Sequence, residues 1–565
     1  MTRAAETMRS PPVPWGPRRP NSVYDALQTM ASLYPDRPLL AVLPETAKVY
    51  GIDAGELSYC EVATAANGLA GRFGAAGYRR GQRIGLLLEN RPQFFITWFA
   101  LNSLGVSVVP INPDLRSGEL EYIVGHSEMV AIVAPPARHA ELSAAATAAG
   151  CAVAVVDFDE IEKLPAATAN DTERYPASLS DECGLLYTSG TTGLPKGCVL
   201  SNDYFLGFGD WYWTLGGRCA IRAGAERLLT PLPAFHMNTM ATALLGMMAA
   251  GGCLIVLDRF HASTWWNSVR ESRATIVHYL GVMPSILMKP PASAQDQAYD
   301  VRFGLGSGVP PELHISFEER FGFPLIEGWA MTETGSGGVL MDCHEPRRRD
   351  TTCIGIPTVD RETRLVKDDG TETADLEPGE LLVRRAGPNP RRGFFDCYLK
   401  DPAATASAWE GGWFHTGDLV KRDAEGFIYF VDRKKNVIRR SGENISAVEV
   451  ELALLRYPLI KTAAVCAVPD DVRGDEVAAC VILKDQLAPE AQQQTAEDIV
   501  RFCLSRLAYY KAPGYVAFVD ELPLTATQKI QRGALKAFTA NAVGSDTGFD
   551  LRALKRRRPE GSQGL

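Results

Sequence analysis

The chain has 565 residues, 46% of them hydrophobic and 22% charged, a composition that excludes disordered and fibrous proteins. The length is too great for one ordinary hydrophobic core, so we expect two or more domains. A formal net charge of −9 argues against nucleic acid as the main partner. The twelve cysteines form no Cys-x-x-Cys pair, and no signal peptide is recognisable, so we expect reduced thiols in a cytoplasmic protein.

The predicted elements alternate between strand and helix through the first half of the chain. Residues 1–20 combine arginines and prolines without an apolar run, which indicates a flexible arm. Helical and strand patterns then alternate, which is typical of βαβ units around a mainly parallel sheet. Helices are predicted over 23–32, 59–76 and 91–103, and strands over 39–43, 83–88, 106–110, 129–134, 151–156 and 253–257.

The run 241–257 is apolar enough to suggest a membrane span. Gly251 and Gly252 divide it, and a buried helix followed by a strand explains it better. We therefore expect no membrane span.

The pattern of predicted strands and helices changes in the second half of the chain. Short alternating runs with glycine and proline over about 351–431 predict a smaller, more antiparallel sheet. A helix over 447–455, strands over 462–467 and 477–483, and a helix over 496–507 form a compact α+β unit. The end of the chain, with Lys555 and three following arginines, is expected to be a disordered basic tail.

A loop rich in hydroxyl groups and glycine, Tyr-Thr-Ser-Gly-Thr-Thr-Gly-Leu-Pro-Lys-Gly at 187–197, follows the apolar run 184–186. Glycine lets backbone N–H groups approach an anion closely, and a lysine adds a point charge. It is not a Walker loop, because Gly197 stands where that motif has Ser or Thr. A plain linker is the alternative, although linkers rarely lie against an apolar strand. The predicted phosphate-binding residues are Thr188, Ser189, Gly190, Thr191, Thr192, Gly193 and Lys196.

This loop resembles the signature of the adenylate-forming superfamily, which contains acyl-CoA synthetases, luciferases and the adenylation domains of peptide synthetases. Further stretches up to residue 532 resemble the family's motifs, in the family's order. The resemblance implies an α/β fold: a large N-terminal region of two α/β lobes plus a small β-barrel-like part, and a small mobile α+β C-terminal domain. The expected division is an arm (1–20), the large domain (21–431), a hinge (432–435), the small domain (436–541) and the tail (542–565).

In the large domain, the resemblance gives roles to three stretches. His236, in 231–238, would border the carboxylate pocket and gate CoA access, although a lone histidine is more often structural. The run 304–308 would pack against adenine through Gly306, Ser307 and Gly308, unless it is an ordinary tight turn.

The third stretch, 327–335, is the strongest of these, with a capped helix start as its alternative. Trp329 would stack near adenine beside Ala330 and Met331, and Thr332 would contact the α-phosphate. Glu333 would ligate Mg²⁺, which prefers hard oxygen ligands. The sequence departs from the family at two positions: Trp329 replaces the commoner tyrosine, and Ala330 replaces the usual glycine.

In the later motifs, the resemblance implies binding of ribose and of CoA. Asp418, in 411–418, would accept hydrogen bonds from both ribose hydroxyls, and Arg433 would also reach the ribose. The loop at 440–446 would meet the pantetheine arm of CoA through Ser441, Gly442 and Glu443.

Two lysines would serve the change between steps. Lys435 would be the pivot of domain rotation, and Lys529, in 523–532, would neutralise charge on the α-phosphate and carboxylate. Gln528 stands before Lys529 in place of the usual glycine, a form shared with relatives of crotonobetaine/carnitine-CoA ligase.

The implied protein is an AMP-forming acyl-CoA ligase that uses ATP, Mg²⁺ and coenzyme A on a carboxylic acid. Gly281 and the glycines of 304–308 suggest room for a bulky acid. Two alternatives remain: a member with impaired adenylation that thioesterifies a supplied acyl-adenylate, and a non-catalytic nucleotide-binding regulator. The sequence identifies neither the acid nor the oligomeric state, and it leaves a homodimer open.

Overall fold

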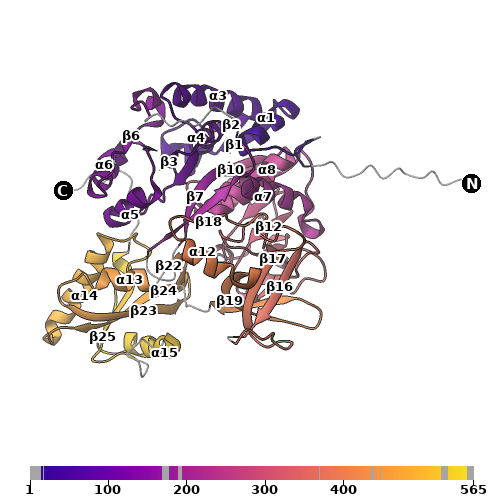
Figure 1. Ribbon diagram of the computed structural model, residues 1–565. Coiled ribbons are helices and arrows are strands. Elements are labelled where there is room, and N and C mark those ends of the chain that lie inside the picture. The colour runs from indigo at the N-terminus through magenta and orange to yellow at the C-terminus, as the bar shows by residue number, and fades with distance from the viewer. Residues whose placement is uncertain are drawn as a thin grey trace, which may run out of the picture.

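The computed structural model describes residues 14–16, 18–167, 177–188, 194–367, 369–433, 438–445, 447–523 and 532–555. A large N-terminal region contains two lobes, each built on a mainly parallel sheet. A third sheet and the small C-terminal domain lie below the two lobes, as Figure 1 shows. The expected α/β fold class is confirmed.

The first lobe sheet is parallel except at its edges, where β2 and β14 run antiparallel to their neighbours. Its strand order is β14 (Leu340–Met341), β13 (Leu325–Trp329), β12 (Phe303–Gly306), β11 (Ile276–His278), β9 (Arg227–Thr230), β10 (Cys253–Val256), β1 (Pro38–Val42) and β2 (Gly55–Ser58).

The second lobe sheet is parallel from β6 to β7, while β8 and β18 run antiparallel at one edge. Its strand order is β18 (Cys397–Tyr398), β8 (Lys196–Ser201), β7 (Glu182–Thr188), β4 (Ser107–Pro110), β3 (Arg83–Leu86), β5 (Ala131–Val133) and β6 (Ala154–Val156).

Helices cover both lobe sheets. The helices of the large region are α1 (Val23–Leu33), α2 (Pro44–Tyr50), α3 (Tyr59–Ala75), α4 (Pro92–Ser103), α5 (Ser117–Ser127), α6 (His139–Ala148), α7 (Asn202–Thr214), the π-helix Asn238–Ala243, α8 (Leu244–Ala250), α9 (Trp265–Ser272), α10 (Val282–Leu287), α11 (Pro311–Phe321) and α12 (Pro402–Ala408). Short 3₁₀ turns occur at Pro136–Arg138, Phe158–Lys163, Gly217–Cys219 and Glu410–Gly412.

Local chemistry explains where several of these helices begin. The helix α3 begins at a capping box, in which the Ser58 hydroxyl accepts from Glu61 N and the Glu61 carboxylate accepts from Ser58 N. The apolar run 241–257 forms the buried π-helix and α8, and Gly251 ends α8 in the left-handed conformation before β10.

No helix in the described part of the chain is long and apolar enough to cross a membrane.

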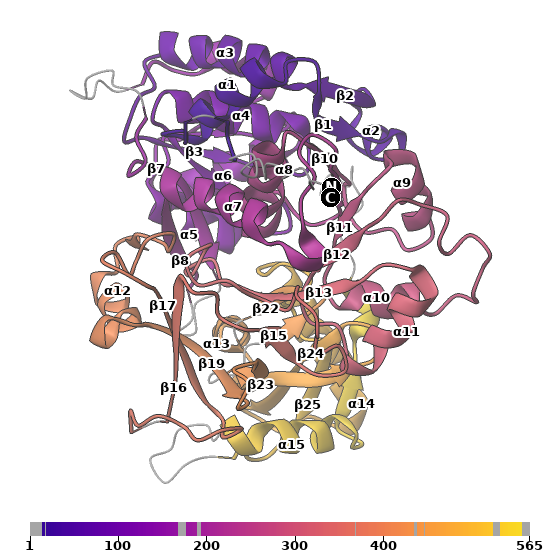
Figure 2. The same cartoon turned by 90° about the vertical axis from the view of Figure 1, so that its right-hand side faces the viewer.

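The third sheet is antiparallel throughout and corresponds to the predicted barrel-like part. Its strand order is β15 (Cys353–Gly355), β20 (Ile428–Arg433), β19 (Phe414–Arg422), β17 (Gly379–Arg385) and β16 (Arg361–Val366). Figure 2 shows it beside the small domain, with both beneath the lobes.

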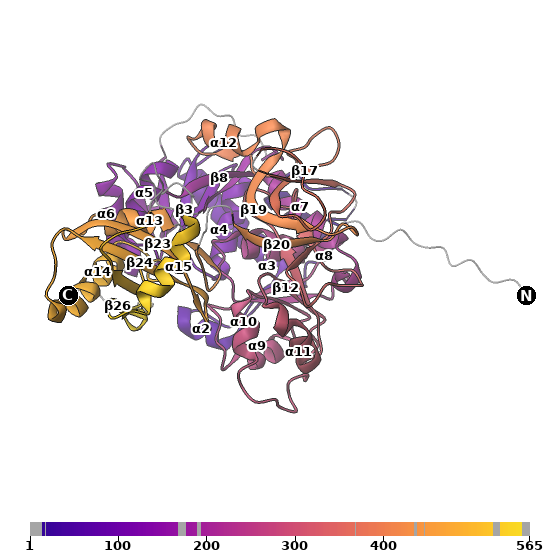
Figure 3. The same cartoon turned by 90° about the horizontal axis from the view of Figure 1, so that it is seen from below.

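The small domain is an α+β unit with its own hydrophobic core. Its elements are β21 (Ile438–Arg440), β22 (Glu443–Ile445), α13 (Ala447–Leu454), β23 (Ile460–Asp470), β24 (Gly474–Leu483), α14 (Pro489–Leu504), β25 (Tyr515–Phe518), α15 (Arg532–Val543), β26 (Gly548–Asp550) and the 3₁₀ turn Arg552–Leu554. Seen from below in Figure 3, it lies beside α5 of the large region. Among the described residues, no hydrophobic cluster joins the two.

Both chain ends are more ordered than the sequence suggests. The tail was expected from residue 542, but α15 continues to Val543 and β26 pairs with β25. The small domain therefore extends to Lys555, and residues 556–565 lie outside the described part. Within the expected arm, Trp15 is buried and donates from its indole N–H to Asp210 at 2.7 Å, because its ring packs against α7.

Candidate active site

A cavity of about 670 Å³ lies where the lobes, the third sheet and the small domain meet. Most of the predicted site residues that the structure describes are on its wall. These are Thr188, Lys196, His236, Ala330, Met331, Thr332, Glu333, Gly442 and Glu443. The predicted residues Ser189, Gly190, Thr191, Thr192, Gly193, Lys435 and Lys529 lie outside the described residues, as does the side chain of Arg433.

Glu333 stands at the end of the cavity that Thr188 and Lys196 line. Its Oε1 accepts hydrogen bonds from the hydroxyls of Thr188 at 3.1 Å and Tyr398 at 3.0 Å. Burial, followed by the nearby Glu333 charge, raises the pKa of Tyr398. The Lys196 ammonium lies over the Tyr398 ring, 4.8 Å from its centroid. Sequence reasoning missed Tyr398, which reaches this site only because β18 pairs with β8.

The residues at this end fit a divalent cation. Glu333 supplies a buried carboxylate, and a hydroxyl oxygen lies beside it. Hard oxygen ligands of this kind suit Mg²⁺ that is shared with phosphate oxygens. No group of three or more candidate metal ligands occurs among the described residues.

Trp329 and Asp418 form one buried unit. The indole Nε1 of Trp329 donates to Asp418 Oδ2 at 2.9 Å, across the gap between β13 and β19. Thr416 also fixes the backbone of Asp418, because the Thr416 hydroxyl oxygen accepts a hydrogen bond from Asp418 N at 3.0 Å. The antiparallel register places Asp418 opposite Arg433, so the two predicted ribose-binding positions are neighbours. The tryptophan at this position therefore orients the aspartate directly.

The glycine run 304–308 does not open the cavity. A Cβ on Gly306 would lie 2.3 Å from Tyr279 O, and one on Gly281 would lie 1.7 Å from Gly308 O. These glycines therefore permit close backbone contact and do not provide room for an acid. Ser307 and Gly308 are exposed, and Gly308 N donates to Glu327 Oε2 at 2.8 Å.

A chain of three hydrogen-bonded polar side chains begins at the cavity wall near His236. Asn238 lies on the cavity, and its Oδ1 is 2.7 Å from Nδ1 of the fully buried His278. The other ring nitrogen of His278 is 3.1 Å from the Tyr212 hydroxyl. Burial lowers the pKa of His278 to about 3, so the ring is neutral and Nδ1 donates to the Asn238 oxygen. This leaves the Asn238 amide group to donate into the cavity.

The small domain contributes the opposite wall. The Glu443 carboxylate lies 3.6 Å from His236 Nε2. Gly442 has a φ of +87°, and a Cβ there would lie 2.0 Å from Leu280 Cδ1. Glycine is therefore needed where this loop meets the large region. Ser441, also left-handed at φ +49°, is held by Arg473, whose carbonyl accepts from Ser441 N at 2.9 Å.

A buried lysine bridges the two domains near this wall. Lys511 Nζ donates to Glu119 of α5 at 2.7 Å and to Glu449 of α13 at 2.8 Å. The two carboxylates raise the pKa of Lys511 despite the opposing effect of its burial. The neighbouring Tyr510 hydroxyl accepts from Asn112 Nδ2 at 2.9 Å. Sequence reasoning missed Lys511, because a lone lysine carries no local sign of partners from two domains.

The fold and this cavity are those of an adenylate-forming enzyme, and comparison with known proteins agrees. The family model of AMP-binding enzymes matches residues 27–395, and the model of their C-terminal domain matches residues 449–529. The chain therefore belongs to the AMP-binding enzyme family.

Characterised relatives point to the acid–thiol ligases within this family. A crotonobetaine/carnitine–CoA ligase of Shigella flexneri is 32% identical over 501 residues, which cover 85% of this chain and 93% of the relative. One from an Escherichia coli strain is 33% identical with the same coverage.

Solved structures of the same class have the same fold. An o-succinylbenzoate CoA synthetase double mutant from Bacillus subtilis, bound to a product analogue, superposes with a TM-score of 0.77 at 26% identity. The match covers 91% of this chain and 98% of that one. A malonyl-CoA ligase with methylmalonyl-CoA and AMP bound gives 0.70 at 29% identity, covering 86% and 97%. By this homology, the chain is an acyl-CoA synthetase.

Proposed function

We propose that the protein is a complete acyl-CoA ligase, which activates a carboxylic acid with ATP and transfers the acyl group to the thiol of CoA. One observation carries this proposal: a single cavity joins Lys196, Thr332 and Glu333 at one end to the Gly442–Glu443 loop of the small domain. Nucleotide groups and a second substrate can thus meet in one cavity between the two domains. The malonyl-CoA ligase above binds AMP and a CoA thioester together, which supports this arrangement.

In the first step, the chain's own residues would hold the nucleotide and neutralise its charge. Lys196 and the hydroxyls of the 188–193 loop would bind phosphate oxygens, and Lys529 would reach the α-phosphate and the carboxylate. Asp418, oriented by Trp329, would bind the ribose. Mg²⁺ held beside Glu333 would supply a positive charge shared with the phosphate oxygens.

In the second step, the small domain would present its loop to the acyl group. Rotation about the 432–435 hinge, with Lys435 as pivot, would withdraw Lys529 and bring in Ser441, Gly442 and Glu443. The arrangement described above, with Glu443 beside His236, resembles the state after this rotation. We also propose the large domain, hinge and small domain as the working units of the enzyme.

The buried Trp329–Asp418 bond favours a complete enzyme over one with impaired adenylation. Trp329 is one of the two departures from the family's pattern, beside Ala330, and its indole donates a hydrogen bond to Asp418, the carboxylate proposed to bind ribose.

The geometry also bears on the acid. Gly281 and Gly306 are in close backbone contact, whereas Asn238 lines the cavity with its Oδ1 bound to His278, which leaves its Nδ2 to donate to a bound acid. We therefore propose an acid that carries a hydrogen-bond acceptor besides its carboxylate, since a donor left unpaired on binding costs affinity.

The experiment incubates the protein with ATP, Mg²⁺, CoA and a panel of carboxylic acids, chosen in pairs with and without an added acceptor. Acyl-CoA is detected by mass spectrometry, and pyrophosphate release is measured separately. We expect acyl-CoA from at least one acceptor-bearing acid, and loss of pyrophosphate release by about 100-fold or more in Glu333→Gln. Glu345→Gln, an exposed carboxylate outside the cavity, is the matched control. Acyl-CoA formed only from a supplied acyl-adenylate would instead identify the impaired member, and no thioester from either source would contradict the ligase.

A further inference from the structure

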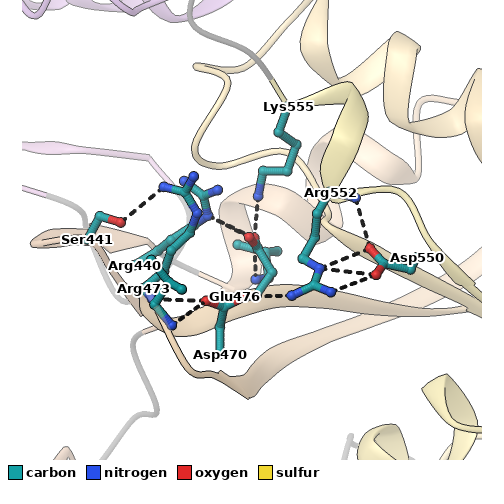
Figure 4. Close-up of polar contacts among 10 residues, drawn as sticks. Arg440, Ser441, Asp470, Arg473, Glu476, Asp550, Arg552 and Lys555 are labelled. Atoms are coloured by element: carbon teal, nitrogen blue, oxygen red, sulfur yellow. Dashed lines mark hydrogen bonds and ion pairs between the residues drawn. The ribbon is translucent and has the colours of Figure 1, made fainter. Parts of the chain in front are cut away.

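A buried cluster of charges lies directly behind the Ser441–Glu443 loop (Figure 4). Both carboxylate oxygens of Glu476, on β24, accept from Arg440 Nε, at 2.9 and 2.8 Å. The ammonium of Lys555 forms an ion pair with the same carboxylate and donates to Tyr510 O at 3.2 Å. The side chains of Glu476 and Lys555 are 0% exposed and that of Arg440 is 2% exposed, so none of these bonds is shared with bulk water.

The cluster supports both segments of the small domain that face the large region. Arg440 immediately precedes Ser441, so the guanidinium held by Glu476 fixes one end of the loop. Tyr510, whose carbonyl binds Lys555, precedes Lys511 and lines the cavity. One ammonium group thus links the Tyr510 segment to Glu476, which in turn holds Arg440 beside the loop.

The segment that delivers Lys555 lies beyond the part of the chain that the family models match. It comprises Gly548–Lys555, and the C-terminal family model ends before it, at residue 529. The segment is secured by pairing of β26 with β25 and by Arg552, which forms ion pairs with Asp550 and Asp470. Asp470 begins the turn that carries Arg473, whose carbonyl and guanidinium bond to Ser441. Figure 4 shows that this segment and turn converge on the base of the loop.

We propose that Lys555 is a positioning residue for thioester formation, which holds the Ser441–Glu443 loop and the Tyr510–Lys511 segment in the arrangement that receives CoA. This inference rests on the proposed ligase function. It adds a residue from outside the matched family domain, one that touches no substrate and acts through Arg440, Glu476 and Tyr510.

The charges around Lys555 predict how its contribution depends on pH. Arg440 and, at longer range, Arg473 oppose its positive charge, and Glu476 alone supports it. Burial first, and then Arg440, lower the pKa of Lys555 to about 7. The ammonium therefore bridges Glu476 and Tyr510 fully below pH 7, and the ion pair weakens as pH rises through 7. Replacing Lys555 by an uncharged residue should cost most at low pH.

The same shift predicts the opposite sign for stability. The pKa of Lys555 is lower in the folded chain than in the unfolded one, so the unfolded chain binds more protons between about pH 7 and about pH 10.4. Stability conferred by this group therefore rises with pH in that window, and the charged lysine opposes folding below it. An uncharged isostere should keep or raise the melting temperature at pH 6.5, whereas loss of a merely structural contact would lower it.

The test uses the full-length protein and follows the two half-reactions separately. Lys555→Met removes the charge with similar volume, and Lys555→Arg restores the charge. Lys484→Met is the matched control, because this exposed lysine of the same domain bonds to Pro458 O and does not touch Glu476. Thioester formation is measured from a chemically prepared acyl-adenylate and CoA, and adenylation from pyrophosphate release without CoA, both at pH 6.5 and 8.5.

We expect Lys555→Met to slow thioester formation about tenfold or more at pH 6.5 and clearly less at pH 8.5. Pyrophosphate release should stay within about twofold of the wild type, the melting temperature should not fall, and Lys555→Arg should recover part of the rate. Equal thioester rates in Lys555→Met and the wild type would overturn the inference alone. So would a parallel loss of both half-reactions and of melting temperature, as in a general loss of packing. A wild-type protein that forms no thioester at all would overturn the proposed function itself.

Discussion

At the scale of single residues, the indole of Trp329 holds Asp418, the proposed ribose-binding carboxylate. Trp329→Phe keeps an aromatic ring but removes the donor to Asp418, a bond worth about 1.5–3 kcal/mol when the acceptor is charged. We expect KM for ATP to rise about tenfold, because the carboxylate loses its orientation, with kcat changed by less than about threefold. Steady-state pyrophosphate release measures both constants. The control is Trp413→Phe, which should leave KM unchanged, because the indole of Trp413 stacks on Arg384 away from the cavity.

Cys343 should differ in reactivity from the other buried cysteines. A hydrogen bond with Cys219 and the nearby His344 lower the pKa of Cys343 to about 7, and its Sγ lies 3.3 Å from His344 Nδ1. The thiol also borders a second cavity, of about 390 Å³, which gives a reagent access. Alkylation of Cys343 should therefore accelerate as pH rises through 7 and level off above 8, because the thiolate is the nucleophile.

Peptide mass spectrometry after timed treatment with iodoacetamide would measure this profile. Cys353 is the internal control, since burial raises its pKa to about 12 and it should show no such inflection. Parallel pH profiles at the two cysteines would contradict the prediction.

At the scale of elements, the turn between β21 and β22 is shaped by its contact with Leu280. Gly442→Ala would place a Cβ 2.0 Å from Leu280 Cδ1 and would impose a φ of +87° on alanine. We expect thioester formation to fall at least tenfold, while pyrophosphate release is nearly unchanged. The two half-reaction assays described above distinguish these steps.

Two controls separate the clash from the backbone strain. Gly370→Ala imposes a similar φ of +81° at a remote position with open space and should leave both half-reactions intact. Adding Leu280→Ala to Gly442→Ala should recover part of the rate of thioester formation. If nothing is recovered, the whole loss comes from the backbone strain at residue 442.

The elements also show what the sequence can and cannot predict. Local periodicity predicted α3, α4 and β10 nearly to their ends, and the motifs pointed to Glu333, Gly442 and Glu443, which the structure places on the wall of one cavity. Such signals are local, because they depend on residues close together in the chain.

The rest depends on distant pairing. Tyr398 reaches Glu333 across a sheet edge, and His278 fixes Asn238 from another strand. The order of the 542–555 segment depends on the pairing of β26 with β25 and on the ion pair of Arg552 with Asp470 of β23. A run of basic residues gives no indication of such a partner, so it reads as a tail.

At the scale of the whole molecule, Lys511 is the polar link between the domains. Lys511→Met would leave Glu119 and Glu449 together in a buried site, and breaking such a bridge costs about 3–5 kcal/mol. For a domain of this size, we expect the melting temperature of the small domain to fall by about 10 °C or more. Differential scanning calorimetry should resolve this as an earlier transition separate from that of the large region.

Lys484→Met is the matched control, because this lysine of the same domain is exposed and bonds only to Pro458 O. Combining Lys511→Met with Glu119→Gln removes one of the stranded charges and should recover part of the loss. A single transition that shifts equally in both lysine variants would show that Lys511 is no more important than a surface lysine.

The separation of the hydrophobic cores has a calorimetric consequence. Each domain keeps its own apolar cluster, and the contacts across the boundary include polar pairs such as Asn112–Tyr510 and Glu119–Lys511. Heat-capacity changes in proteins arise mainly from exposure of apolar surface. Moving the small domain should therefore involve a small heat-capacity change, far below that of unfolding either part. The enthalpy of such a movement should then stay nearly constant with temperature, so a van't Hoff plot of the balance between the proposed orientations should be close to a straight line from cold to warm conditions.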